Sequence, residues 1–169
     1  MATLDLRTVR LRSGEQFQDV RAIELEPYDL GGQRYLPVPE KPEGTITITR
    51  TSSGHLFELE LEARVLGPCM RCLEETEVTT HVASREYQAS SPGDAEELST
   101  PYLQNDRLDL SGWAHDAIAL ALPDKILCRA DCAGLCARCG ADLNREACTC
   151  GPPEPDTRWA KLAELRDRL

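Results

Sequence analysis

Alternation of apolar and polar residues between positions 45 and 87 is the strongest pattern in the chain. The stretch TITITR (45–50) alternates isoleucine with threonine, and after the turn-like TSSG the stretch HLFELELEARVLG (55–67) alternates again. A period of two is typical of a strand with one buried face. We therefore predict an antiparallel sheet, and in its second strand these side chains should face the core: Phe57, Leu59, Leu61, Ala63 and Val65.

A weaker alternation predicts a third strand in TEVTTHVASREYQ (76–88). The segment that joins it to the second strand is GPCMRCLEE (67–75), so we expect Cys69 and Cys72 at the tip of a hairpin. Upstream, TLDLRTVRLR (3–12) and DVRAIELEPYDL (19–30) could supply further strands before a proline-rich loop.

The period changes to a helical one in DLSGWAHDAIALALP (109–123), where Asp109 or Ser111 is the candidate N-cap and Pro123 the stop. Apolar residues at helical spacing in this stretch are Trp113, Ala117, Leu120 and Ala121. The preceding stretch, 90–107, is polar, acidic and interrupted by prolines, which predicts a linker or mobile loop. A second amphipathic helix is predicted at the end of the chain, with Trp159, Leu162, Leu165 and Leu169 on one side.

Six of the eight cysteines lie between residues 128 and 150. The N-terminal stretch has no apolar signal region, and no window approaches the 18 or so apolar residues of a membrane span, so we expect a soluble, cytoplasmic protein. In reducing cytosol, clustered cysteines are metal or redox sites more often than disulfide frameworks. A secreted disulfide scaffold remains the alternative.

Four of these cysteines have the spacing of one zinc site. Structural zinc takes four ligands, commonly as two pairs that are each presented by a tight turn. Cys136-x-x-Cys139 is followed by Gly140, which permits a backbone conformation that brings amide N–H groups toward the thiolates. Cys148-x-Cys150 follows eight residues later and completes the tetrahedron of a zinc ribbon-like module.

The remaining cysteines are Cys69, Cys72, Cys128 and Cys132. A second tetrahedral site made from these four would leave no orphan thiol and would join the hairpin tip to the segment after the helix. Alternatives are one site drawn from a different foursome, an iron–sulfur cluster, or unliganded cysteines packed as small hydrophobes. We thus expect one or two Zn²⁺ ions. One short unit, C-x-R-C, recurs at 69–72 and 136–139.

The sequence favours a structural role for the metal over catalysis. Catalytic zinc keeps a coordination position open and uses histidine or carboxylate ligands, whereas here thiols fill every position. The histidines, at 55, 81 and 115, have no nucleophile or carboxylate at a diagnostic spacing. We therefore expect a protein that is not an enzyme. The competing class is a redox or metal-responsive switch, in which thiolates are oxidised and the metal is released.

These elements predict an α+β fold. It consists of a bent antiparallel sheet or partly open barrel, one internal helix, a Cys-rich zinc-binding module and a C-terminal helix. We expect a mainly β domain at 1–124 that ends in the internal helix, and a second domain at 125–169 that is packed on the first and holds the Cys-rich module. An apolar content of 41% supports a core, and 5% aromatics makes it mostly aliphatic.

The net charge of −10 argues against a protein that binds bare RNA or DNA. Residues 1–124 carry 11 basic and 22 acidic side chains, whereas residues 125–169 carry 8 and 7. An acidic body suits basic protein partners, although it could equally serve only solubility. Arginines that border the cysteines could still contact RNA, unless they pair with the nearby Asp131, Asp142 and Glu146. These are Arg129, Arg138, Arg145 and Arg158.

The chain resembles the YceD family, which is named for accumulation of the large ribosomal RNA. The resemblance rests on CMRCLEE (69–75), ALALP (119–123), CRADCAGLCARCGADLN (128–144) and the distal CTC (148–150), and it covers about residues 45–165. It implies a role in synthesis or processing of that RNA or in assembly of the large subunit, and no catalytic activity. The expected partner is a basic ribosomal protein or assembly factor, with no membrane association.

Overall fold

The computed structural model describes residues 2–90, 98–151 and 158, and the chain forms two compact units, Met1–Cys132 and Ala133–Leu169. The expected division into domains at 124/125 stays a prediction. Cys128 and Cys132 lie in the first unit together with the cysteines of the hairpin tip. The predicted C-terminal helix lies outside the described residues.

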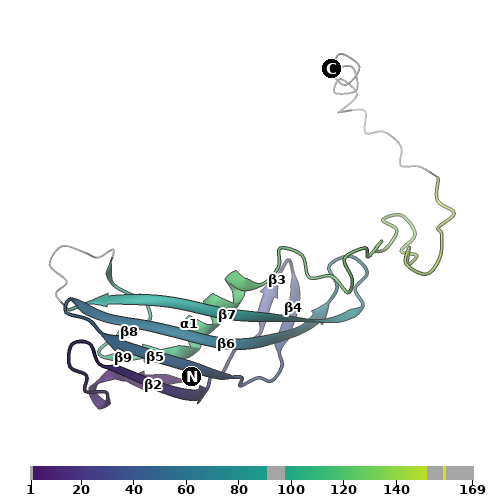
Figure 1. Ribbon diagram of the computed structural model, residues 1–169. Helices are drawn as coiled ribbons and strands as arrows, with labels where there is room; N and C mark the ends of the chain where they lie inside the picture. Colours follow the sequence, from purple (N-terminus) through teal and green to yellow (C-terminus); the bar gives the residue numbers. More distant parts are fainter. Residues whose placement is uncertain (1, 91–97, 152–157, 159–169) are drawn as a thin grey trace. The chain divides into compact units, whose positions relative to one another are not determined.

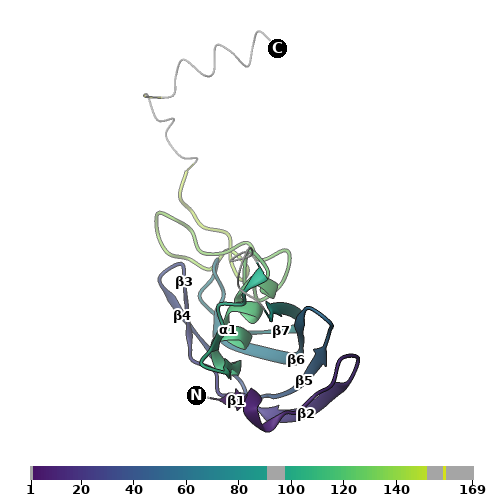
Figure 2. The same cartoon turned by 90° about the vertical axis from the view of Figure 1, so that its left-hand side faces the viewer.

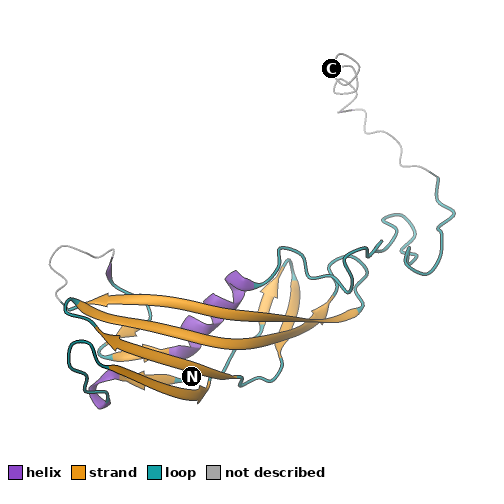
Figure 3. Ribbon diagram, in the orientation of Figure 1, coloured by secondary structure: helices purple, strands orange, loops and turns teal. Residues whose placement is uncertain are grey.

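The first unit is built on a six-stranded sheet in which every pair of strands is antiparallel (Figures 1 and 3). The long strand β6 is its centre: β7 pairs with β6 along its full length on one edge, while β5 and then β4 pair on the other. Among the described residues β7 pairs with β6 alone, so β7 forms one margin of an open sheet. Its strands are β2 (Gln16–Ala22), β3 (Tyr28–Leu30), β4 (Gln33–Pro37), β5 (Glu43–Arg50), β6 (Gly54–Pro68) and β7 (Glu75–Ala89).

The three strands predicted from the alternating pattern are β5, β6 and β7, and the predicted inward face is confirmed. Its side chains are at most 7% exposed, and they form one core cluster with residues from β5 and from the helix. The hairpin tip between β6 and β7 carries Cys69 and Cys72, as expected.

A second, three-stranded sheet corrects the prediction of a linker at 90–107 for the end of that stretch, because residues 103–104 and 107 belong to its strands; residues 91–97 lie outside the described residues. Its strands are β1 (Thr3–Asp5), β8 (Leu103–Gln104) and β9 (Arg107–Asp109), and a 3-10 turn at Leu6–Thr8 follows β1. Leu4 pairs with Leu108, and both side chains are buried. This pairing joins positions more than a hundred residues apart, so local polarity could not reveal it.

Helix α1 (Leu110–Ala121) lies against one face of the curved main sheet (Figure 2). Asp109 is its N-cap and accepts a hydrogen bond from the Gly112 N–H (3.0 Å). The buried Trp113 donates from Nε1 to Ser84 Oγ on β7 (2.9 Å). Leu120, at helical spacing with Trp113, is 88% exposed, so it is not part of the core-facing stripe, in which Ala114 and Ile118 are buried instead.

The described part of the second unit, residues 133–151, has almost no regular secondary structure. One isolated bridge pairs Leu135 with Asp142, and the Cys136 N–H donates to Ala141 O (2.8 Å). None of the described residues after Cys132 belongs to the buried hydrophobic core. Apolar burial therefore cannot hold this segment in one conformation.

Within the part of the chain that the structure describes, no helix has the length and apolar character needed to cross a bilayer.

Candidate metal centres

The first cysteine cluster contains Cys69, Cys72, Cys128 and Cys132 and lies within the first unit. All four sulfurs lie within 4.8 Å of one another. Cys69 Sγ is 3.8 Å from Cys132 Sγ, and Cys72 Sγ is 3.5 Å from Cys128 Sγ. Zinc–sulfur bonds of about 2.3 Å in a tetrahedron place the sulfurs about 3.8 Å apart. The cluster thus fits a tetrathiolate zinc site, and none of its four cysteines is joined to another in a disulfide.

Hydrogen bonds hold the two contributing segments of this cluster together. At the hairpin tip, the Cys69 N–H donates to Glu74 O (2.7 Å), and Leu73 adopts a positive φ of 63° that closes the turn. The Met70 N–H donates to Ile126 O (2.8 Å), which docks the tip on the segment after α1. Three of the four cysteines are buried and Cys128 is half-buried, so the protein shields most of this cluster from solvent.

The second cluster contains Cys136, Cys139, Cys148 and Cys150 and lies within the second unit. Its sulfurs also lie within 4.8 Å of one another, but none of the four side chains is buried and Cys139 is exposed. Gly140 has a φ of +74°, the left-handed conformation for which the sequence predicted a glycine. Its N–H donates to Cys136 O (2.8 Å), which closes the turn between the first two cysteines.

The arginine of each C-x-R-C unit has a structural partner that the sequence did not reveal. Arg71 Nη1 donates to Cys132 O (2.6 Å), and Arg138 Nη1 donates to Gly151 O (3.2 Å), next to Cys150. In both clusters, therefore, the arginine links the C-x-x-C turn to the segment that carries the other cysteine pair. The repeat of the tetrapeptide was the only signal in the sequence that could have indicated this shared role.

The local electrostatics leave one easily ionised thiol in each cluster. Burial opposes ionisation of Cys69, yet the backbone N–H groups of Cys72 and Arg71 lower its pKa to about 6. The N–H groups of Cys139 and Arg138 lower the pKa of Cys136 to about 6.

In each cluster another thiol has a raised pKa. Burial and the hydrogen bond with Cys72 raise the pKa of Cys128 to about 12. The hydrogen bond with Cys139, together with burial, raises the pKa of Cys150 to about 12. A second thiolate is costly beside the first, and a divalent cation would remove that cost. The donor set and its ionisation thus both suit zinc.

An Arg71→Gln variant is expected to bind zinc about tenfold more weakly at the first cluster, because partners that position metal ligands typically contribute tenfold or more to affinity. Competition with a chromophoric chelator measures this. The matched variant is Arg64→Gln on β6, whose arginine pairs with Glu77 (3.5 Å) away from the cysteines and should leave zinc affinity unchanged. Equal affinities of the wild type and Arg71→Gln would show that Arg71 does not position the ligands.

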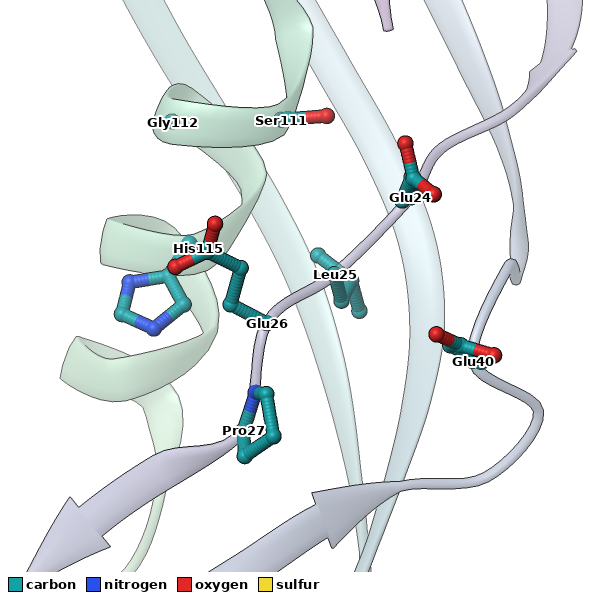
Figure 4. Close-up of a pocket in the computed structure, with 8 residues that line it drawn as sticks. All are labelled: Glu24, Leu25, Glu26, Pro27, Glu40, Ser111, Gly112 and His115. Carbon is teal, nitrogen blue, oxygen red and sulfur yellow. The ribbon is translucent and has the colours of Figure 1, made fainter. Parts of the chain in front are cut away.

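The first unit also contains a pocket of about 490 Å³ with an acidic lining (Figure 4). Glu24, Glu26 and Glu40 contribute carboxylates, and α1 contributes Ser111 and His115. The Ser111 hydroxyl accepts the Ala2 N–H (2.8 Å), and the His115 ring stacks on Tyr28 with centroids 4.4 Å apart. Neither contact joins a nucleophile to a base, so these contacts give no basis for assigning a reaction to the pocket.

The fold and the two cysteine clusters together define an α+β protein with two tetracysteine groups. Comparison with known families shows which family this chain matches. The family described as large ribosomal RNA subunit accumulation protein YceD matches residues 57–166. The chain therefore belongs to the YceD family, which confirms the resemblance seen in the sequence.

Relatives are found in mycobacteria and in a plant. The chain is 33% identical over 124 residues to an uncharacterized protein of Mycobacterium tuberculosis and to one of Mycobacterium bovis, an alignment that covers 71% of this chain. It spans 59% of the length of those relatives. It is also 34% identical over 62 residues to the chloroplastic large ribosomal RNA subunit accumulation protein YCED homolog 1 of Arabidopsis thaliana, covering 37% of this chain and 19% of that protein. No solved structure matches the chain.

Proposed function

We propose that this protein is a non-enzymatic, zinc-binding factor in biogenesis of the large ribosomal subunit, which supports accumulation of large ribosomal RNA through protein partners in the cytoplasm. The observation that carries the zinc part is the presence of two groups of four thiols with sulfur separations suited to tetrahedral coordination. The family name and the plant relative's name support the ribosomal part.

Metal analysis of the purified chain tests the zinc part. We expect two equivalents of zinc per chain, with thiols that react fully only after a chelator is added. Substitution of Cys148 by serine should reduce the content to one equivalent. Metal-free protein whose thiols are all reduced and which shows native exchange protection in both units would contradict the proposal.

The proposed partner is a basic ribosomal protein or assembly factor, because the chain carries a net charge of −10. Two arginines considered for RNA contact have acidic neighbours: Arg129 Nε lies 3.4 Å from Asp131, and Arg145 Nε lies 3.1 Å from Asp142. These ion pairs favour a protein partner over the phosphate backbone. Capture from lysate should recover basic ribosomal proteins after nuclease treatment, whereas loss of all partners on nuclease treatment would instead favour RNA.

A redox or metal-responsive role is the second candidate, and the exposure of the second cluster favours it. Cys139 is exposed, whereas Cys69, Cys72 and Cys132 are buried. Thiolates that reach solvent are oxidised more readily. Mild peroxide followed by zinc and thiol counting separates the two functions: a regulatory site should release one zinc ion, and a purely structural pair of sites should release none.

A further inference from the structure

We infer that the outer edge of β7 is a docking surface for an extended protein segment in which basic and apolar residues alternate, and that this segment adds to the main sheet as a further strand. The inference rests on the proposed function, from which the basic protein partner is taken. It assigns that partner a place on the fold and a residue pattern.

The first observation is the open edge itself. β7 is 15 residues long, and among the described residues β6 is the only strand that pairs with it. Unpaired N–H and C=O groups along a strand edge are a template for another strand, and natural edges are commonly blocked by proline or lysine. β7 contains neither residue, and its one arginine, Arg85, pairs with Glu58 of β6 (2.8 Å). Its backbone can therefore accept a strand along this edge (Figure 1).

The second observation is the acidic outer face next to this edge. A shallow depression of about 470 Å³ is lined by Glu43, Glu60, Glu62 and, on β7, Ala83. Glu60 lies directly across from Ala83 in the β6–β7 register. Glu62 Oε2 lies 3.6 Å from His81 Nδ1, whereas Glu43 and Glu60 form no ion pair within the part of the chain that the structure describes. The face beside β7 therefore carries uncompensated negative charge.

The geometry of the sheet allows a basic side chain to use this charge. Neighbouring strands lie about 4.8 Å apart, so an added strand would lie about 10 Å from β6. Ala83 has only a methyl group, and a lysine opposite it can extend over that methyl group toward Glu60. Charge complementarity thus selects lysine or arginine on the outward face of the added strand.

The third observation lies on the opposite face of the same edge. Trp113 and, two helical turns later, Leu120 occupy one flank of α1, and Trp113 faces β7 through its hydrogen bond to Ser84. Thr80 Oγ1 donates to Ala121 O (3.1 Å), so the C-terminal turn of α1 lies over β7. Leu120 remains 88% exposed there. Because successive side chains of a strand point to opposite faces, the residues between the lysines would meet Leu120.

A peptide of eight residues that alternates lysine and valine, with both ends blocked, is the probe for the zinc-loaded full chain. We expect saturable binding in fluorescence anisotropy. N-methylation of alternate residues blocks one edge of an extended peptide, so methylating one set should weaken binding at least tenfold while methylating the other set leaves it intact. Equal effects of the two methylated peptides, whether both bind or neither does, would overturn strand addition.

Matched variants locate the surface. Leu120→Ser should weaken peptide binding about tenfold, because the valines of the peptide lose their apolar contact with the leucine side chain. Val20→Ser on β2 is the control, since Val20 is 58% exposed on a different strand. Glu60→Gln should weaken binding about threefold, and Glu26→Gln in the pocket of Figure 4 should not. Unchanged binding by Leu120→Ser and Glu60→Gln, with native thermal melts, would overturn the assignment.

Purified basic proteins of the large ribosomal subunit separate this inference from the proposed function. If the wild type binds one of them and Leu120→Ser and Glu60→Gln bind it less tightly, the docking surface is supported. If the variants bind it as the wild type does, the surface is wrong and the proposed partner stands. If the wild type binds none of them but still binds the alternating peptide at β7, the proposed partner is wrong and the strand-accepting edge stands.

Discussion

A Cys69→Ser variant is expected to bind one zinc ion instead of two and to lose about 4 kcal/mol of stability in the first unit. Cys69 is fully buried at the hairpin tip, where a serine hydroxyl cannot replace a thiolate ligand. Ligand binding to the native state contributes RT ln(1 + [L]/Kd), which is about 4 kcal/mol when free zinc exceeds Kd a thousandfold. Metal analysis and chemical unfolding monitored by tryptophan fluorescence measure the two effects.

The matched variant is Cys136→Ser in the second cluster. It should also lose one equivalent of zinc, but unfolding of the first unit should be unchanged because the two clusters lie in separate compact units. Trp113 is the useful reporter, since it is buried in the core of the first unit. Two equivalents of zinc in Cys69→Ser, or equal destabilisation of the first unit by both variants, would contradict the assignment of ligands.

Where burial repeats with a local period, the sequence was sufficient to predict the fold. Phe57, Leu59 and Leu61 alternate with exposed or half-buried residues because β6 buries one face, and the structure places all three in the core. Capping chemistry likewise limited the start of α1 to two candidates, Asp109 and Ser111, of which Asp109 is the N-cap. These signals act over a few residues, so a single sequence contains them.

Features that depend on distant parts of the chain were not predictable in this way. The pairing of Leu4 with Leu108 requires a tertiary contact between two short strands. The exposure of Leu120 depends on where α1 meets β7, and helical spacing alone assigned it to the same face as Trp113. Periodicity identifies which residues can share a face, but only the packing decides which face is covered.

The grouping of the cysteines could be predicted from the sequence for a different reason. Cys136, Cys139, Cys148 and Cys150 are close in sequence, so short turns bring them together. The second group, Cys69, Cys72, Cys128 and Cys132, was predicted because a site made from these four left no cysteine without a role. Its scaffold did not follow, because the contact of Arg71 with Cys132 O joins segments 61 residues apart.

Removal of zinc by a strong chelator is expected to unfold the described part of the second unit while the main sheet of the first unit persists. Residues 133–151 contribute nothing to the hydrophobic core, so with zinc bound as proposed the metal would be the main source of their stability. Hydrogen exchange should accelerate about a hundredfold or more at the N–H groups of Cys136, Gly140 and Leu143, which donate to backbone carbonyls.

The first unit provides the internal control in the same sample. Leu59 lies at the centre of β6, between β5 and β7, and is fully buried, so its N–H should remain protected without metal. Met70, whose N–H binds Ile126 O next to the first cluster, should show intermediate acceleration. Persistent protection of Cys136 and Gly140 after complete metal removal would mean that the polypeptide alone orders the second unit. This expected dependence on metal follows from the contrast between the first unit, which has an apolar core, and the second, whose described residues have none but include four closely spaced thiols.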